Sequence, residues 1–155
     1  MIPPFQRFLD EHRSDVWRLL VASVGRDAAD DCFQETFLAA MRAYPRLRAD
    51  SNLRGWVLTI AHRKALDHHR ARARNPFPVA EVPEPPAPRT TAGDTGDDAW
   101  ARVRELPARQ RAVLTLRFAA DLPHADIAAV LGCSEEASRA AASAGLTRLR
   151  QELTS

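Results

Sequence analysis

Hydrophobic residues recur every three or four positions along most of the chain, which is the spacing of one face of an α-helix. In the N-terminal part this pattern covers residues 5–20 and 32–44, and Pro45 should end the second helix. A third helix should begin at residues 51–52, Ser and Asn, which are good N-caps, and run to a basic end near Arg74. The positions expected to face inward on the second helix are Cys32, Phe33, Thr36, Phe37, Ala40, Met41 and Tyr44. No stretch alternates apolar and polar residues for long enough to predict a strand.

The C-terminal part has the same helical spacing in shorter segments. A short apolar face formed by Trp100, Val103 and Leu106 comes first, and a helix over 108–120 follows Pro107. Residues 125–131 should form another helix, which Gly132 ends through a left-handed turn, and Ser134 is placed to cap a final helix. Two helices joined by a short turn that contains Gly are typical of the helix-turn-helix, although a purely structural helical hairpin is the alternative.

A proline-rich, acidic segment separates the two parts. Six prolines fall between Pro76 and Pro88, and few large apolar side chains accompany them. Such a sequence buries too little surface to offset the entropy of ordering it, so a semi-rigid linker is expected. The sequence therefore predicts an all-α protein of two small helical domains, 1–74 and 99–155, joined by a linker over 75–98.

Composition fits a soluble, folded chain of 155 residues that is 45% hydrophobic and 27% charged. Its apolar runs are short, so we expect no membrane insertion. Cys32 and Cys133 lie far apart without a C-x-x-C partner, which fits a reducing cytoplasm better than a disulfide framework or a zinc site. The net charge of +2 divides into +4 for 1–74, −4 for 75–98 and +2 for 99–155.

The end of the third predicted helix, residues 61–74, is strongly basic. It carries five Lys or Arg residues against the single acid Asp67, and Arg63, Arg70 and Arg74 share roughly one side of the helix. This arrangement suits contact with a phosphate backbone, and a solvated charged face is the equally weighted alternative. His68 and His69 are adjacent and point apart, so the histidines do not predict a metal site.

The outer stripe of the second helix carries acidic and polar residues opposite its apolar face: Asp31, Gln34, Glu35, Leu38 and Arg42. These carboxylates lie on a convex helix without a nearby nucleophile or histidine, which favours a solvated or protein-docking face over acid–base chemistry. The chain also lacks a phosphate loop, a G-x-S-x-G turn and metal-spaced His or Cys residues. We therefore expect no enzymatic activity, no catalytic residue and no cofactor.

Three segments resemble the bacterial sigma-70 family of RNA polymerase sigma factors, specifically the extracytoplasmic-function (ECF) group. Residues 29–37, ADDCFQETF, are similar to the D-x-x-Q-E-x-F signature in the part of sigma that binds core polymerase. Residues 53–67 resemble the segment for the promoter −10 element, and residues 106–118 with 126–128 resemble the C-terminal domain that reads the −35 element. The segments occur in the family's order and cover nearly the whole chain.

The resemblance implies a sigma factor with a region 2-like domain over 1–74 and a region 4-like domain over 99–155. Its implied partners are core RNA polymerase and promoter DNA, with an anti-sigma factor as a further candidate. By position, the core-polymerase set is Asp31, Gln34 and Glu35. The −10 set is Asn52, Arg54, Trp56, Arg63, Lys64, Asp67 and Arg70. The −35 set is Ser134, Ser138, Arg139 and Ser143.

Three questions stay open at this point: the role of Trp56, the low number of basic residues in the last helix, and a competing function. Trp56 has the spacing of a core residue as well as the chemistry to stack on an unstacked base. The helix after Ser134 has Arg139 as its single basic residue before Arg148, whereas family members commonly carry several Arg residues there. A free-standing helix-turn-helix regulator that acts without polymerase is the competing function, but it has no need for the Asp31-x-x-Gln34-Glu35 stripe.

Overall fold

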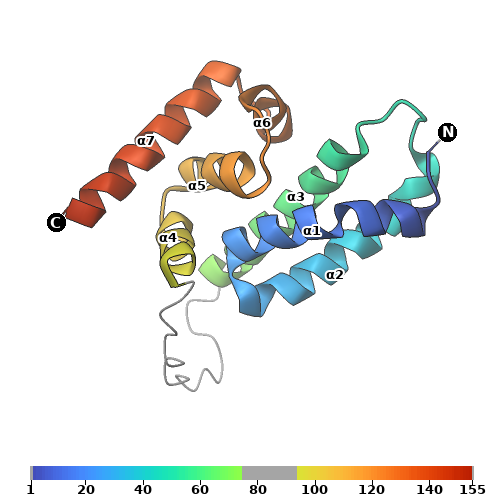
Figure 1. The fold of residues 1–155 in the computed structure, drawn as a ribbon, viewed down its shortest axis with the longest axis horizontal. Helices are drawn as coiled ribbons and strands as arrows, with labels where there is room; N and C mark the ends of the chain where they lie inside the picture. Colours follow the sequence, from blue (N-terminus) through green and yellow to red (C-terminus); the bar gives the residue numbers. More distant parts are fainter. Residues whose placement is uncertain (1, 75–93, 155) are drawn as a thin grey trace.

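The computed structural model describes residues 2–74 and 94–154, which contain helices and no strand. The N-terminal domain consists of α1 (Phe5–Val24), α2 (Arg26–Ala43), the 3₁₀ turn η1 (Tyr44–Arg46) and α3 (Leu53–Arg74). The C-terminal domain consists of α4 (Asp94–Arg104), α5 (Ala108–Leu114), the π-helical turn η2 (Thr115–Ala119), α6 (His124–Leu131) and α7 (Glu135–Thr154). The expected all-α fold of two helical domains is confirmed (Figure 1).

The N-terminal domain is a three-helix bundle closed by aromatic packing. Phe8 of α1 is fully buried, and its ring centroid lies 5.1 Å from Tyr44, 5.7 Å from Trp56 and 6.3 Å from Phe37. Each of these rings comes from a different element, so this cluster fixes how α2 and α3 pack on α1. Pro45 lies in η1 directly after α2, where it was expected to end the helix.

The C-terminal domain contains the expected helix-turn-helix. Gly132 ends α6 with φ 68° and ψ 38°, a left-handed conformation that glycine adopts without steric cost. The hydroxyl of Ser134 accepts a hydrogen bond from the Ala137 amide at 3.0 Å and caps α7. Helices α5 and α7 approach closely, because a Cβ added at Gly145 would lie 2.9 Å from Leu114 Cδ1.

Several boundaries differ from the sequence prediction. Helix α1 continues to Val24 and α2 begins at Arg26, beyond the ranges 5–20 and 32–44 of the apolar pattern. The expected helix over 108–120 is α-helical to Leu114 and then widens into η2, where the Ala120 amide donates to the Thr115 carbonyl at 3.2 Å. Helix α4 begins at Asp94, inside the range 75–98 expected to be linker, because a helix extends beyond the apolar residues that signal it. Residues 75–93 of that expected linker lie outside the described residues.

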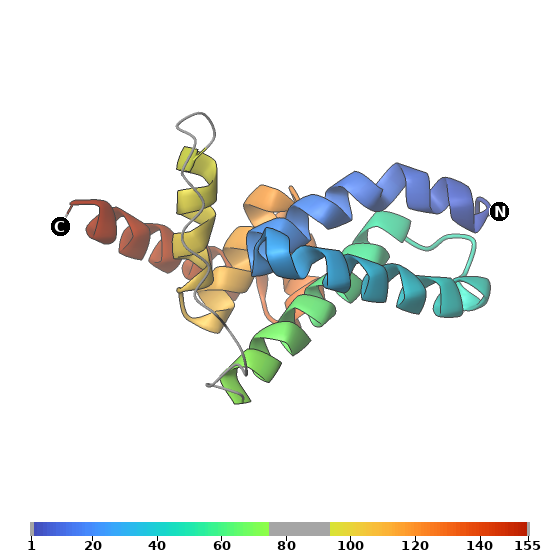
Figure 2. The same ribbon diagram turned by 90° about the horizontal axis from the view of Figure 1, so that it is seen from below.

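The two domains pack against each other rather than standing apart. Helix α1 contacts α4 and η2, and α3 contacts α6, as two perpendicular views show (Figures 1 and 2). The buried apolar residues form one connected core that includes Leu19 of α1, Val57 of α3, Leu116 of η2 and Leu122. The chain ends lie at opposite ends of this arrangement.

Candidate functional site

The outer face of α2 is open to solvent. Asp31, Gln34 and Glu35 are all exposed, while the opposite side of the same turns buries Cys32 and Thr36. The three predicted core-polymerase residues therefore form one surface, which we call the α2 face and which also includes Leu38 and Met41.

Apolar side chains extend the α2 face. Leu38 is 48% exposed and Met41 is 50% exposed. Met41 was expected to face inward, and this was wrong because its helical position lies at the border between the buried and solvent sides. Large exposed apolar side chains beside polar ones are typical of a protein-docking surface.

The basic end of α3 is also open to solvent. Arg63, Asp67 and Arg70 are exposed and follow one another at helical spacing, and Lys64 beside them is half-buried. Together they form a cationic stripe with one carboxylate on the outside of the N-terminal domain. Such a stripe can follow a phosphate backbone.

The beginning of α3 is arranged differently, because its residues have partners within the protein. Asn52 is exposed, and its Oδ1 accepts a hydrogen bond from the Gly55 amide at 3.1 Å, which caps α3. Trp56 is half-buried and packs on Phe8, with Tyr44 at a centroid distance of 6.3 Å. Trp56 was expected either to belong to the core or to stack on a base. Its packing supports the core role, and its exposed part lines a surface groove.

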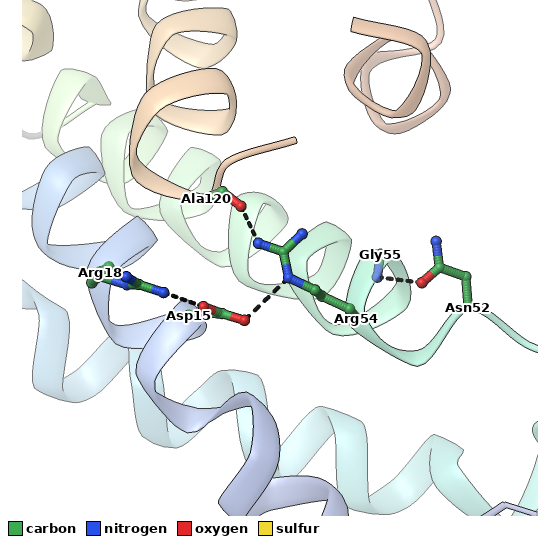
Figure 3. A network of polar contacts seen from close by, with 6 residues as sticks. All are labelled: Asp15, Arg18, Asn52, Arg54, Gly55 and Ala120. Carbon is green, nitrogen blue, oxygen red and sulfur yellow. Dashed lines mark hydrogen bonds and ion pairs between the residues drawn. The ribbon is translucent and has the colours of Figure 1, made fainter. Parts of the chain in front are cut away.

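Arg54 connects three elements (Figure 3). Its Nε donates to Asp15 Oδ2 on α1 at 3.1 Å, and its Nη2 donates to the main-chain carbonyl of Ala120 at the end of η2. Asp15 also accepts from Arg18. Burial alone would raise the pKa of Asp15, but the hydrogen bonds from Arg54 and Arg18 and their positive charges hold this pKa below its usual value.

Three of the four predicted DNA-binding residues of the helix-turn-helix are exposed. Arg139 and Ser143 lie one turn apart on the exposed side of α7, and Arg139 pairs with Glu135 at 3.1 Å. Because this ion pair lies at the surface, it holds the guanidinium only weakly. Ser134 is exposed, but its hydroxyl already accepts the α7 capping hydrogen bond.

Ser138 was expected on the DNA-facing surface of α7, and this was wrong because it is buried. Its side chain is fully buried, and its Oγ lies 2.7 Å from His124 Nδ1 at the start of α6. This hydrogen bond holds the two helices of the motif together, so the role of Ser138 in this arrangement is structural. His124 was not predicted as part of this contact, and the single signal for it in the sequence is its place in the first turn of α6.

A cluster of histidine and arginine side chains lies where the domains meet. His62 is buried in α3, and His69 Nε2 lies 2.8 Å from the Ser23 carbonyl at the end of α1. Burial and the nearby Arg111 lower the pKa of both histidines to about 4. Arg104 Nη1 donates to the carbonyls of Val21 and Ala22 at 3.1 and 3.2 Å.

The described residues contain no group of His, Cys, Asp and Glu side chains that could hold a metal ion. Among the helices of the described ranges, none is long and apolar enough to cross a bilayer.

Two family models match the chain and divide it between them. Sigma-70 region 2 matches residues 8–75, and Sigma-70 region 4 matches residues 97–149. These ranges correspond to the N-terminal bundle and the C-terminal domain described above.

The curated relatives that match the chain are also sigma factors. The chain is 34% identical over 145 residues to a probable RNA polymerase sigma-C factor of Mycobacterium bovis, an alignment that covers 83% of this chain and 71% of the relative. It is 35% identical over 136 residues to the ECF RNA polymerase sigma factor ShbA of Streptomyces griseus, covering 81% and 71%. It is 33% identical over 151 residues to the ECF RNA polymerase sigma factor SigD of Mycobacterium tuberculosis, covering 88% and 69%.

Solved structures share the fold. The sigma factor RpoE in complex with the anti-sigma factor NepR, from Bartonella quintana, superposes with a TM-score of 0.77 at 23% identity, covering 97% of this chain and 96% of that one. CnrH in complex with the cytosolic domain of CnrY superposes with a TM-score of 0.74 at 22% identity, covering 97% and 87%.

The buried histidines predict that the protein loses stability in mild acid. Their pKa is near 6.5 in the unfolded chain and about 4 in the folded one, so the unfolded chain binds more protons between these values. The contribution of the neutral histidines to stability is complete above pH 6.5 and falls toward pH 4, by on the order of 3 kcal/mol from His62 alone. Denaturant unfolding at several pH values measures this loss.

Replacing His62 and His69 by Gln should flatten the stability profile between pH 6.5 and 4. Asp15 affects stability at lower pH than the histidines do. Because its pKa is lowered in the folded chain, its contribution is lost only as the pH falls below the ordinary range of a carboxyl group. A wild-type profile that is flat from pH 7 to 4.5 would contradict the buried, neutral state of these histidines.

Proposed function

The chain belongs to the ECF group of sigma-70 family sigma factors, and from this membership we propose how its surfaces divide the work of promoter recognition. As a member of this family it is a transcription initiation factor that binds core RNA polymerase and directs it to promoter DNA, and the family is not enzymatic. The observation that carries this conclusion is the match of regions 2 and 4, in order, to the two helical domains. We place its action in the cytoplasm, with the polymerase and the chromosome.

We assign residues 1–74 to core and −10 binding and residues 99–155 to −35 binding, with the chain between them as connector. The family models support this division, since region 2 ends at residue 75 and region 4 begins at 97. The free-standing regulator has no comparable support, because the exposed α2 face would then lack a partner.

We assign the α2 face, with Asp31, Gln34 and Glu35, to core polymerase. Its support is exposure: all three polar residues are solvent-accessible, and Leu38 and Met41 add apolar area that a partner could bury. A docking surface of this kind gains orientation from its charges and affinity from its apolar contacts.

The assigned −10 set lies on α3 and has two parts. Arg63, Lys64, Asp67 and Arg70 provide the solvent-facing stripe, which supports contact with the phosphates of a melted strand. Asn52, Arg54 and Trp56 lie at the other end of the helix, where the groove beside Trp56 is the place for an unstacked base.

The assigned −35 set is reduced to Ser134, Arg139 and Ser143, since Ser138 is buried. Arg139 is the strongest candidate for base contact, because an arginine can bind guanine through two hydrogen bonds. The complexes of the structural relatives support an anti-sigma factor as a further candidate partner, alongside core polymerase and promoter DNA.

Promoter binding should depend on core polymerase. The N-terminal domain has a net charge of only +4, which gives too weak a field for tight binding to DNA at physiological salt. A gel shift on a promoter fragment should therefore show a specific complex with core polymerase and none with the chain alone. Nanomolar, sequence-specific binding by the chain alone would favour the free-standing regulator instead.

Reversing charge on the α2 face should weaken polymerase binding without unfolding the protein. We expect the double variant Asp31→Lys/Glu35→Lys to bind core at least about tenfold more weakly in a fluorescence titration, because both side chains lie at the assigned interface. The matched control is Asp10→Lys/Glu11→Lys, which makes the same charge change on the exposed side of α1. Equal affinity of the two double variants would refute the assignment.

Arg139 should dominate −35 reading. Arg139→Ala in holoenzyme should relax specificity at one or two adjacent base pairs and cost about 1–3 kcal/mol of promoter affinity. Arg148→Ala is the matched control, because Arg148 is also exposed and also faces an acid one turn away, Glu152 at 4.0 Å. A promoter-library readout compares them, and an unchanged −35 preference in Arg139→Ala would show that α7 does not read DNA through this residue.

A further inference from the structure

We propose that His124 and Ser138 form a positioning pair, a hydrogen bond between the two helices of the helix-turn-helix that sets the rotation of α7 and so determines which −35 base pairs Arg139 can read. The inference rests on the proposed function of α7 in −35 binding. It gives a role in base selection to two residues outside the assigned −35 set.

The pair connects the start of α6 to the first turn of α7. Ser138 Oγ lies 2.7 Å from His124 Nδ1, and the Ser138 side chain is fully buried. Nδ1 accepts from the hydroxyl in one ring tautomer and donates to it in the other, so a hydrogen bond forms in either. A buried hydroxyl that loses its partner costs stability, and the contact therefore favours one orientation of α7.

His124 is held in place by the segment that precedes it. Leu122 is buried in the apolar core, and its amide donates to the Leu116 carbonyl at 3.0 Å. The Pro123 carbonyl accepts from the Ile127 amide, also at 3.0 Å, so that α6 begins directly at His124. Because these contacts fix the start of α6, the imidazole is a fixed reference point for α7.

The buried and exposed sides of α7 are linked by helix geometry. Ser138, Ala142 and Gly145 are buried and follow one another at spacings of four and three residues, which places them on one side of the helix. Arg139 and Ser143 each come one residue after a member of this row, so they lie about 100° further around the helix. The direction of the Arg139 side chain therefore depends on the rotation of α7.

The apolar contacts of this part of α7 define its rotation poorly. Besides Arg139, residues 137–145 are only Ala, Ser and Gly. Such small side chains interdigitate little with a neighbouring helix, and Gly145 permits a close approach to Leu114 of α5 without a side chain of its own. The hydrogen bond to His124 supplies the directional contact that these side chains do not.

A small rotation of α7 is enough to change base reading. A helix with its side chains is about 10–12 Å across, so a rotation of about 20° moves an outward-pointing group by roughly 2 Å. A bidentate contact between arginine and guanine tolerates less, because a good hydrogen bond needs about 2.7–3.2 Å between its heavy atoms. Loss of the pair should weaken the preference for one −35 sequence more than binding to DNA in general, because phosphate contacts do not depend on base identity.

The test removes the hydrogen bond from each side and restores it from one. Ser138→Ala deletes the hydroxyl, and His124→Leu leaves a branched side chain without a polar atom. His124→Asn is the rescue, because its amide stands as many bonds from the backbone as Nδ1 does and can remake the hydrogen bond. The matched control is Thr115→Val, which removes a buried hydroxyl of the same domain that donates to the Ala112 carbonyl at 3.0 Å.

The first measurement uses holoenzyme and a promoter library randomised at the −35 element. We expect Ser138→Ala and His124→Leu to lower the preference for the best −35 sequence over its single-base changes at least about fivefold. His124→Asn and Thr115→Val should stay within about twofold of wild type, and the double variant Ser138→Ala/His124→Leu should lose no more than either single variant. Circular dichroism checks that each variant folds, and Ser138→Ala with His124→Asn carries the test if His124→Leu does not.

The second measurement needs neither DNA nor polymerase. Residual dipolar couplings of the backbone amides in the isotopically labelled free chain give the orientation of α7 relative to α6. This orientation should change in Ser138→Ala and remain that of wild type in Thr115→Val and His124→Asn.

The proposal is overturned if Ser138→Ala keeps either the wild-type helix orientation or the wild-type −35 preference. It is also overturned if Thr115→Val loses as much preference as Ser138→Ala, because the effect would then be one of stability alone. Failure of the proposed function has a different signature: wild-type holoenzyme would show no preference among −35 sequences, which removes the role of the pair in base selection as well.

Discussion

The guanidinium of Arg54 occupies the point on which the arrangement of the two domains depends. It satisfies a carboxylate from α1 and a main-chain carbonyl that follows η2, two acceptors from opposite domains. A partly buried guanidinium and a partly buried carboxylate each need a partner, since an unpaired charge away from water is costly. The hydrogen bond from Arg54 to the Ala120 carbonyl is made because η2 lies against α1. Leu116 and Leu122 are buried in the shared apolar core, and this burial also stabilises the contact between the two domains.

This constraint divides the surfaces of the molecule by accessibility. On our account, the α2 face can bind polymerase while the domains are docked, and the exposed side of α7 is likewise open. The start of α3 lies beside α6, with the groove next to Trp56 between them.

Helical spacing, proline and glycine were sufficient to predict the elements, but contacts between distant segments were not. Gly132 and Ser134 have local signatures, and the structure places them in the expected turn and cap. Ser138 was expected at the surface because a serine on a helix is usually exposed. Its burial depends on a contact with His124 of the preceding helix, which the local sequence does not indicate. Arg54 was expected to contact the −10 element, and its partners within the protein were not predicted because they lie far away in the sequence. They are a carboxylate 39 residues away and a main-chain carbonyl 66 residues away, which any residue type can supply. Met41 was misplaced because it lies at the edge of a helical face.

Hydrogen exchange with mass spectrometry, on the free chain and on its complex with core polymerase, can locate the surface that polymerase covers. We expect amides of α2 to gain protection in the complex, because core polymerase covers the α2 face. If the amides of α2 exchange in the complex as they do in the free chain, polymerase does not bind this face.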